Sequence, residues 1–126
     1  MSQLCNWEEI KFFKKEEFNC SHTGKNEMNH VFMQKLDCLR KLIQRPLVVS
    51  SGFRDVTHPI ESAKTKAGMH TKGIAVDLLS SHQHAMSIVK HAMDLGIKGI
   101  GVKQKGDYGS RFIHLDARET PAFWSY

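Results

Sequence analysis

The chain has 126 residues, of which 40% are hydrophobic and 25% charged, a composition that suits one globular domain with its own core. No stretch approaches the roughly 20 uncharged apolar residues of a membrane span. The stretch from Met1 to Phe18 carries acidic side chains where a signal peptide needs an apolar run. We therefore expect a protein made in the cytoplasm, without a signal peptide and without membrane insertion. The net charge of +5 favours an anionic partner, such as nucleic acid, a membrane surface or an acidic wall polymer.

Neither the cysteines nor the basic residues indicate a specialised class of protein. Cys5, Cys20 and Cys38 are an odd number at wide spacings, so we expect reduced thiols rather than a disulfide framework. The basic residues are scattered from Lys11 to Arg118, without the compact block that nucleic-acid-binding modules tend to show. We therefore expect a solvated basic surface and no nucleic-acid partner.

The first 27 residues lack a clear hydrophobic period, and we expect them to wrap around a core formed by residues 28–126. A short helical turn is predicted near Lys14 to Phe18. From Met28 the apolar residues recur with a helical period that Pro46 ends, which predicts one amphipathic helix. The apolar positions of this helix are Val31, Phe32, Leu36, Leu39, Leu42 and Ile43.

The rest of the chain alternates strands with one further helix. Leu47 to Val49 predicts a short buried strand, and the aperiodic stretch from Asp55 to Thr71 predicts a long, functional loop. Ser81 can cap a second helix that Gly96 stops. Three more strands are predicted at residues 74–79, 97–102 and 111–116, the last two joined by a turn at 105–109. Together these elements predict a single α+β domain with a small, mostly antiparallel sheet and two main helices.

Eight histidines in so short a chain suggest a metal site, but position explains most of them. His22 and Cys20 could hold a metal only with two further ligands, which their neighbourhood lacks. Four histidines lie in the predicted helices, where polar-face or capping roles are expected: His30, His82, His84 and His91.

Two of the remaining histidines each precede an aspartate on a predicted strand. His70, near the end of the predicted loop, precedes Asp77, and His114 precedes Asp116. In an extended strand Asp77 points away from its apolar neighbours, while His114 and Asp116 share one face. Two histidines and a carboxylate, with a fourth position left to water, are what a catalytic zinc ion needs. A histidine on a strand is more often a hydrogen-bonded structural residue, so spacing alone leaves both interpretations open.

Three motifs occur in order: Ser51-Gly52-Phe53-Arg54, then His70-x-x-Gly73-x-Ala75-x-Asp77, then Phe112-Ile113-His114-x-Asp116. Together they resemble the zinc D-Ala-D-Ala carboxypeptidase and L-alanyl-D-glutamate endopeptidase family, especially its short, phage-type branch, over roughly residues 10–126. The resemblance implies a fold shared with the Hedgehog signalling domain and one zinc ion held by His70, Asp77 and His114. It gives Arg54 a role at the substrate, binding a carboxylate or polarising the scissile carbonyl, which suits a planar and permanently charged guanidinium. Gly73 and Ala75 would allow close backbone packing near the metal, although a simple turn glycine is an equally physical explanation for Gly73.

Two positions depart from the family's pattern. Gly68 stands where the family has a serine two residues before the first ligand. Arg111 stands where several relatives have a carboxylate three residues before the second histidine, so the motifs leave the general base unassigned. Asp116 is one candidate base; its competing role is to orient a ligand histidine by accepting that ring's other N–H. Asp107, in the preceding turn, is a further candidate.

We therefore expect a monomeric zinc metallopeptidase that hydrolyses bacterial peptidoglycan stem peptides or cross-links, as an endopeptidase or a D,D-carboxypeptidase. It would be a phage endolysin or a wall-remodelling enzyme, and would reach the cell wall after release or as a virion component. The alternative is a Hedgehog-like binding module that keeps zinc without hydrolytic activity, which Arg111 in place of the acid leaves open. A basic nucleic-acid-binding domain is the least favoured interpretation.

Overall fold

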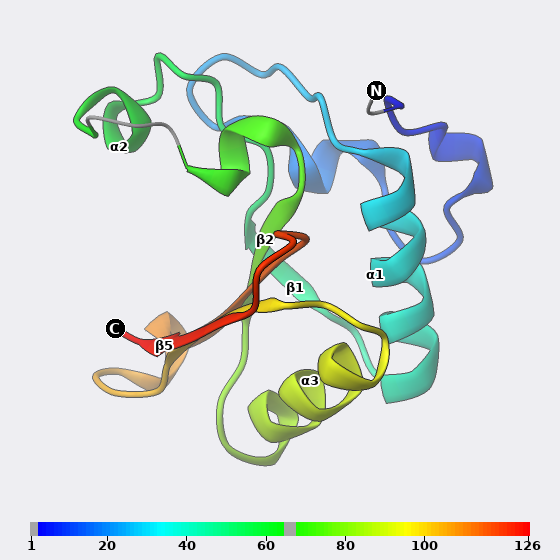
Figure 1. Cartoon of the computed structure of the whole chain (residues 1–126), viewed down its shortest axis with the longest axis vertical. Helices are drawn as coiled ribbons and strands as arrows, with labels where there is room; N and C mark the ends of the chain where they lie inside the picture. Colours follow the sequence, from blue (N-terminus) through cyan, green and yellow to red (C-terminus); the bar gives the residue numbers. More distant parts are fainter. Residues whose placement is uncertain (1–2, 65–67) are drawn as a thin grey trace.

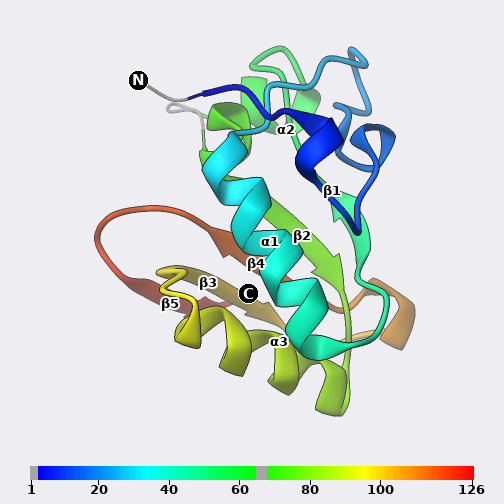
Figure 2. The same ribbon diagram turned by 90° about the vertical axis from the view of Figure 1, so that its right-hand side faces the viewer.

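The structure is a computed structural model that describes residues 3–64 and 68–126. A five-stranded sheet carries two long helices, α1 (His30–Ile43) and α3 (His82–Asp94), on the same face (Figure 1, Figure 2). Between the helices and the sheet lies one core cluster of buried apolar side chains. The predicted fold class is confirmed: a small α+β domain with a mostly antiparallel sheet and two main helices.

The sheet has the spatial order β1-β2-β4-β3-β5. Its strands are β1 (Val48–Ser51), β2 (Ala75–Leu79), β3 (Gly99–Lys103), β4 (Phe112–Asp116) and β5 (Ala122–Ser125). All neighbours are antiparallel except β3 and β5, which are parallel. β5 was not predicted, because its four residues at the sheet edge show no alternation of polar and apolar side chains. β1 is the other edge, so the prediction of a buried strand is wrong for Val48, which is 53% exposed.

α1 follows the predicted period but turns a slightly different face to the core. Asn29 caps its start by accepting a hydrogen bond from the Phe32 N–H at 2.9 Å, and Gln44, in the left-handed conformation, follows its last residue. Val31 and Leu42, predicted on the apolar face, are 55% and 49% exposed. The buried side chains of α1 are His30, Phe32, Met33, Leu36 and Leu39.

The second long helix begins and ends where it was predicted. α3 follows Ser81, whose side chain makes no capping hydrogen bond, and Gly96 takes a left-handed φ of 77° just after the helix ends. The predicted polar-face position is wrong for His30 and His84, which are both buried. His30 lies under the N-terminal segment, where its Nδ1 accepts a hydrogen bond from the Asn6 N–H at 3.1 Å.

The segment predicted as a long loop contains two short helices. These are α2 (Pro59–Ser62), which His58 caps through Nδ1, and the 3-10 helix η3 (Met69–Lys72); residues 65–67 lie outside the described part of the chain. Before α1, the N-terminal segment forms the 3-10 helices η1 (Trp7–Glu9) and η2 (Lys15–Phe18), the second matching the predicted turn. Its Phe13 and Phe18 are buried in the main core.

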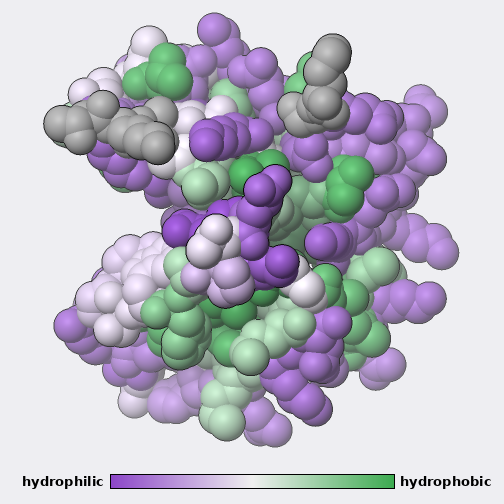
Figure 3. All heavy atoms as spheres, viewed as in Figure 1, coloured by the Kyte–Doolittle hydropathy of each residue, from purple (hydrophilic) through white to green (hydrophobic). Residues whose placement is uncertain are grey.

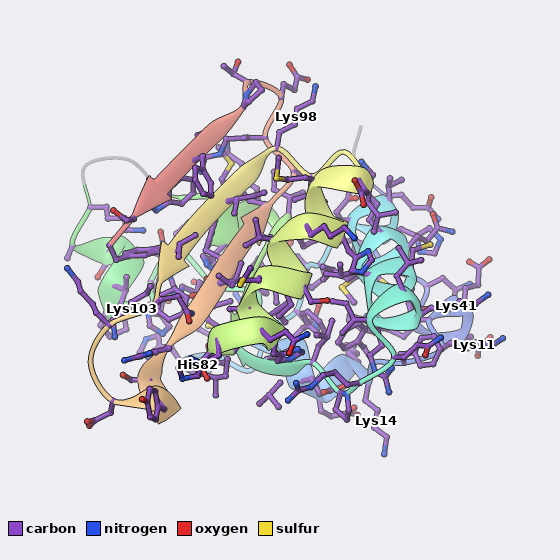
Figure 4. The ribbon with its side chains drawn as sticks, turned by 90° about the horizontal axis from the view of Figure 1, so that it is seen from below. Lys11, Lys14, Lys41, His82, Lys98 and Lys103 are labelled. Atoms are coloured by element: carbon purple, nitrogen blue, oxygen red, sulfur yellow. The ribbon has the colours of Figure 1, made fainter. Side chains whose placement is uncertain are left out.

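The charged surface is spread over several sides of the molecule. Figure 4 shows Lys98 and Lys103 at opposite ends of β3, with Lys11, Lys14 and Lys41 on the far side beyond α3. Within residues 3–64 and 68–126, no helix has both the length and the apolar character needed to cross a membrane.

Candidate metal centre

One cross-strand row of the sheet carries the candidate site. The register pairs Ser51 with Asp77, Asp77 with His114, His114 with Gly101, and Gly101 with Trp124. Directly paired residues project from the same face of a sheet. The residues flanking Asp77 and His114 are buried in the core under the helices, so the predicted alternation is confirmed. The row therefore lies on the sheet face opposite α1 and α3.

His70 reaches this row from outside the sheet, in η3. Gly73 ends η3 with a left-handed φ of 71°, and a Cβ there would collide with the Glu27 carbonyl. Gly73 is therefore both a turn glycine and a close-packing glycine. The Nδ1 atom of His70 lies 2.8 Å from the Gly52 carbonyl oxygen, so this nitrogen carries the hydrogen and donates it. The lone pair of Nε2 is thereby left free, 3.4 Å from Asp77 Oδ1.

His114 lies between two carboxylates. Its Nδ1 is 2.9 Å from Asp77 Oδ1, and its Nε2 is 2.7 Å from Asp116 Oδ2. Burial alone would lower the pKa of His114, but its hydrogen bonds to Asp116 and Asp77 outweigh burial and raise that pKa. Burial would conversely raise the pKa of Asp77, yet the hydrogen bond with His114 and the nearby His70 ring hold that pKa far below its usual range. Without a metal, these groups thus favour a protonated ring between two carboxylates.

His70, Asp77 and His114 each offer one ligand atom, and these atoms all lie within 4.8 Å of one another. Two imidazoles and one carboxylate are the donors of catalytic zinc sites that keep a position open. Each ring also has its second nitrogen hydrogen-bonded, one to a carbonyl and one to a carboxylate, as ligand histidines usually do. The residues present therefore fit a zinc ion. Across residues 3–64 and 68–126 no second cluster of this kind occurs, and Cys20 and His22 form none.

Asp116 is completely buried, and both of its oxygens are occupied. Oδ1 accepts hydrogen bonds from the backbone N–H and the Nε of Arg118, at 3.1 and 2.8 Å. Oδ2 accepts from Arg118 Nη2 at 2.6 Å and faces His114 Nε2. Burial would raise the pKa of Asp116, but the bonds to Arg118 and His114 hold it well below the usual range. This geometry suits an orienting partner of His114 better than a proton acceptor for water.

Arg54 lies beside the cluster as part of an ion-pair network. Its Nη2 is 3.5 Å from Asp77 Oδ2, and its Nη1 is 3.0 Å from Glu61 Oε2. Its Nε donates to Ser51 Oγ at 3.0 Å. The guanidinium is therefore held next to a candidate ligand, with its carboxylate-binding capacity partly used inside the protein.

Glu61, which the sequence did not single out, anchors this network from α2. Its side chain is completely buried; Oε1 accepts from the Gly68 N–H at 3.0 Å, and Oε2 pairs with Arg54 and with Lys64 at 3.3 Å. Burial would raise the pKa of Glu61, but bonds from Gly68, Arg54 and Lys64 lower it. A Cβ on Gly68 would lie 3.1 Å from Lys64 Nζ, so the glycine that replaces the family's serine fits tightly against this ion pair.

A cavity of about 400 Å³ lies over the cluster, with His70, Asp77 and His114 in its lining. Figure 3 shows the surface hollowed between the part that carries α2 and the end of β5. One wall is aromatic and consists of the neighbouring rings of Phe112, Trp124 and Tyr126; Ile60, Lys64 and Met69 also line the cavity. The sequence prediction missed this aromatic wall, because two of its members belong to the unpredicted strand β5 and its end.

Neither Asp107 nor Arg111 lines this cleft. Arg111 stacks over the Tyr108 ring at 4.4 Å and donates to the Gly106 carbonyl, beside the 3-10 helix η4 (Tyr108–Ser110). Asp77, which lines the cleft, is ion-paired with Arg54, and Glu61, which pairs with the lining residues Arg54 and Lys64, is completely buried. In the described part of the chain, the cleft thus offers no carboxylate free of such partners.

A His/Asp/His cluster that lines an open cleft has the donor set of a catalytic zinc site. The family profile described as Peptidase M15 matches residues 11–116. The chain therefore belongs to the Peptidase M15 family, that of the zinc D-Ala-D-Ala carboxypeptidases, which is a family of metallopeptidases. A search of curated proteins finds no significant match.

Proposed function

We propose that this chain is a zinc peptidase that cleaves peptide bonds in the stem peptides or cross-links of bacterial peptidoglycan. The observation that carries the proposal is the meeting of His70, Asp77 and His114 below an open cleft in a chain of the Peptidase M15 family. In this proposal the three side chains are the zinc ligands. The chain works as a monomer and reaches the cell wall after release or as a virion component.

The charges around the cluster favour an anionic substrate. Three carboxylates pair with three cations there: Glu61, Asp77 and Asp116 with Arg54, Lys64 and Arg118. With neutral histidines these charges cancel, so a divalent ion leaves a positive surplus. Stem peptides carry carboxylates close to their scissile bonds, and a positive cleft attracts them. Of these three cations, Lys64 is the most available to a substrate carboxylate, because its side chain is 42% exposed.

The proposed chemistry is metal-assisted hydrolysis of an amide. Zinc in such a site acts as a Lewis acid that polarises a carbonyl and acidifies water. Asp116 accepts a hydrogen bond from His114 Nε2, so Nδ1 is the nitrogen that would bind the metal once it has lost its proton. Arg54 places a positive charge beside Asp77, where it can also meet the carbonyl oxygen of a substrate. Burial and the charges of Asp77 and Asp116 raise the pKa of Tyr126, so its phenol remains a hydrogen-bond donor at neutral pH.

A second candidate function is a zinc-containing binding module without hydrolytic activity. The observation that favours it is the absence, among the described cleft residues, of a carboxylate free of ion pairs. A general base within reach of the attacking water is the usual requirement for this hydrolysis. The peptidase and the binding module share the metal site, and they differ only in whether the bound peptide is hydrolysed.

The deciding experiment is digestion of purified peptidoglycan followed by mass spectrometry of the products. Three samples are compared: zinc-loaded protein, protein with a chelator, and chelated protein with zinc restored. Loss of a terminal alanine indicates a carboxypeptidase, and new internal termini indicate an endopeptidase. We expect cleavage that the chelator abolishes and zinc restores. Zinc-loaded protein that binds peptidoglycan but releases no product would overturn the peptidase and support the binding module.

A further inference from the structure

The C-terminal strand β5 lies outside residues 11–116, which the family profile matches, yet it borders the metal cluster. β5 pairs in parallel with β3 and places Trp124 opposite Gly101, which in turn lies opposite His114. Trp124 therefore projects from the same sheet face as His114, two strands away. The neighbouring Phe123 points to the other face and is 73% exposed.

Two glycines of β3 make room for this arrangement. A Cβ on Gly101 would lie 2.6 Å from Trp124 Cε2, so the indole occupies the space that any side chain at this position would fill. A Cβ on Gly99 would likewise overlap the carboxylate of Asp116. A glycine within a strand commonly marks such a close approach. Gly101 thus lets Trp124 reach toward His114 across β3, and Gly99 leaves room for the Asp116 carboxylate beside His114.

The Trp124 indole contacts both ends of the hydrogen-bonded chain that leads to His114. The His114 ring centroid is 5.2 Å from that of Trp124, and the Arg118 guanidinium carbon lies 4.8 Å above the indole. Arg118 binds both oxygens of Asp116, and Asp116 faces His114 Nε2. Arg118 is 28% exposed, so a rigid aromatic surface beneath it limits the conformations in which it could leave Asp116.

We propose that Trp124 is a positioning residue of the metal centre. Its indole holds Arg118 in the two-point contact with Asp116, and Asp116 then fixes His114 with Nδ1 directed at the metal position. Residues that orient metal ligands typically contribute about 10- to 100-fold to metal affinity. Trp124 acts indirectly, through Arg118, so we expect its loss to lower zinc affinity by about tenfold, the lower end of that range. The inference rests on the proposed ligand set but does not require hydrolysis.

The test is zinc affinity, measured by competition with a chelator of known affinity, in the full-length chain. Trp124→Ala is compared with Phe123→Ala, a matched control on the same strand whose side chain points away from the cluster. We expect Trp124→Ala to weaken zinc binding about tenfold, and Trp124→Phe to recover part of the loss. Phe123→Ala should bind like the wild type. Wild-type affinity in Trp124→Ala, or an equal loss in both alanine variants, would overturn the inference.

A double-mutant cycle with Arg118→Ala separates positioning from general stability. If Trp124 acts through Arg118, adding Trp124→Ala to Arg118→Ala should weaken zinc binding little further. Independent, additive losses would contradict the mechanism. If Trp124→Ala does not fold, the same cycle is run with Trp124→Phe. A wild-type chain that binds no zinc would overturn the proposed function together with this inference, whereas zinc binding with additive losses would overturn the inference alone.

Discussion

Replacing Asp116 with asparagine removes one charge and keeps the shape of the side chain. An amide has one acceptor oxygen, whereas the carboxylate accepts hydrogen bonds from Arg118 on both oxygens and also faces His114 Nε2. If the amide nitrogen faces His114, Nε2 must accept and Nδ1 must carry the hydrogen, which blocks it as a ligand. If the amide nitrogen takes the place of Oδ1 instead, it opposes the N–H and Nε donors of Arg118. Either orientation damages the site.

The expected loss of stability follows from the burial of the Asp116–Arg118 ion pair. Removing one partner of a buried ion pair costs about 3–5 kcal/mol of unfolding free energy. Asp116 is completely buried but Arg118 is 28% exposed, so water can solvate part of the orphaned guanidinium. We therefore expect Asp116→Asn to lose about 3 kcal/mol, at the lower end of that range. Zinc affinity should fall about 10- to 100-fold, because His114 loses its orienting partner.

The assays are urea unfolding of the metal-free protein and zinc titration against a competing chelator. Asp107→Asn is the matched control, because Asp107 is exposed and does not line the cleft. Wild-type stability and zinc affinity in Asp116→Asn would refute the reasoning. Unchanged zinc affinity with lost hydrolysis would show instead that Asp116 serves as the general base.

Three further outcomes are expected. Asp77→Asn should lower zinc affinity at least about 100-fold, measured by titration, because the cluster loses its only anionic ligand; zinc binding at wild-type strength would exclude Asp77 as a ligand. Glu61→Gln should cost about 2–3 kcal/mol in urea unfolding, since its buried carboxylate binds Arg54 and Lys64; an unchanged midpoint would contradict that network. The raised pKa of His114 stabilises the metal-free protein below about pH 6.5, and this stabilisation is lost as pH rises through the folded-state pKa. Zinc binding displaces that proton, so the affinity of the protein for zinc should rise over the same pH range. A zinc affinity that does not change between pH 6 and 8 would argue against His114 as a ligand.

Local patterns were enough to predict most of the fold. The helical period of α1 and the strand character of β2 and β4 are properties of neighbouring residues, so they are visible in the sequence. β5 is different, because its four residues become a strand only by pairing with β3 across the sheet edge. The exposure of Val48 follows in the same way from the edge position of β1, which sequence spacing does not reveal.

The sequence likewise predicted part of the candidate site and missed the rest. Strand alternation and motif order together indicated His70, Asp77 and His114, and the structure brings these three side chains together. Glu61 and Trp124 were missed, because Glu61 lies in the stretch predicted as a loop, where α2 places it beside Arg54, and Trp124 lies in the unpredicted strand β5. One sequence signal was available: the alternation Gly99-x-Gly101 within a predicted strand indicates close approach of other side chains.

The most direct test of the metal centre is an anomalous difference map at the zinc edge from crystals of the zinc-loaded protein. We predict a single strong peak about 2.0–2.2 Å from His70 Nε2, an Asp77 carboxylate oxygen and His114 Nδ1. The Nε2 atom of His114 should remain hydrogen-bonded to Asp116. A map without a peak at this cluster, or with a peak bonded to His114 Nε2, would contradict the proposed ligand set.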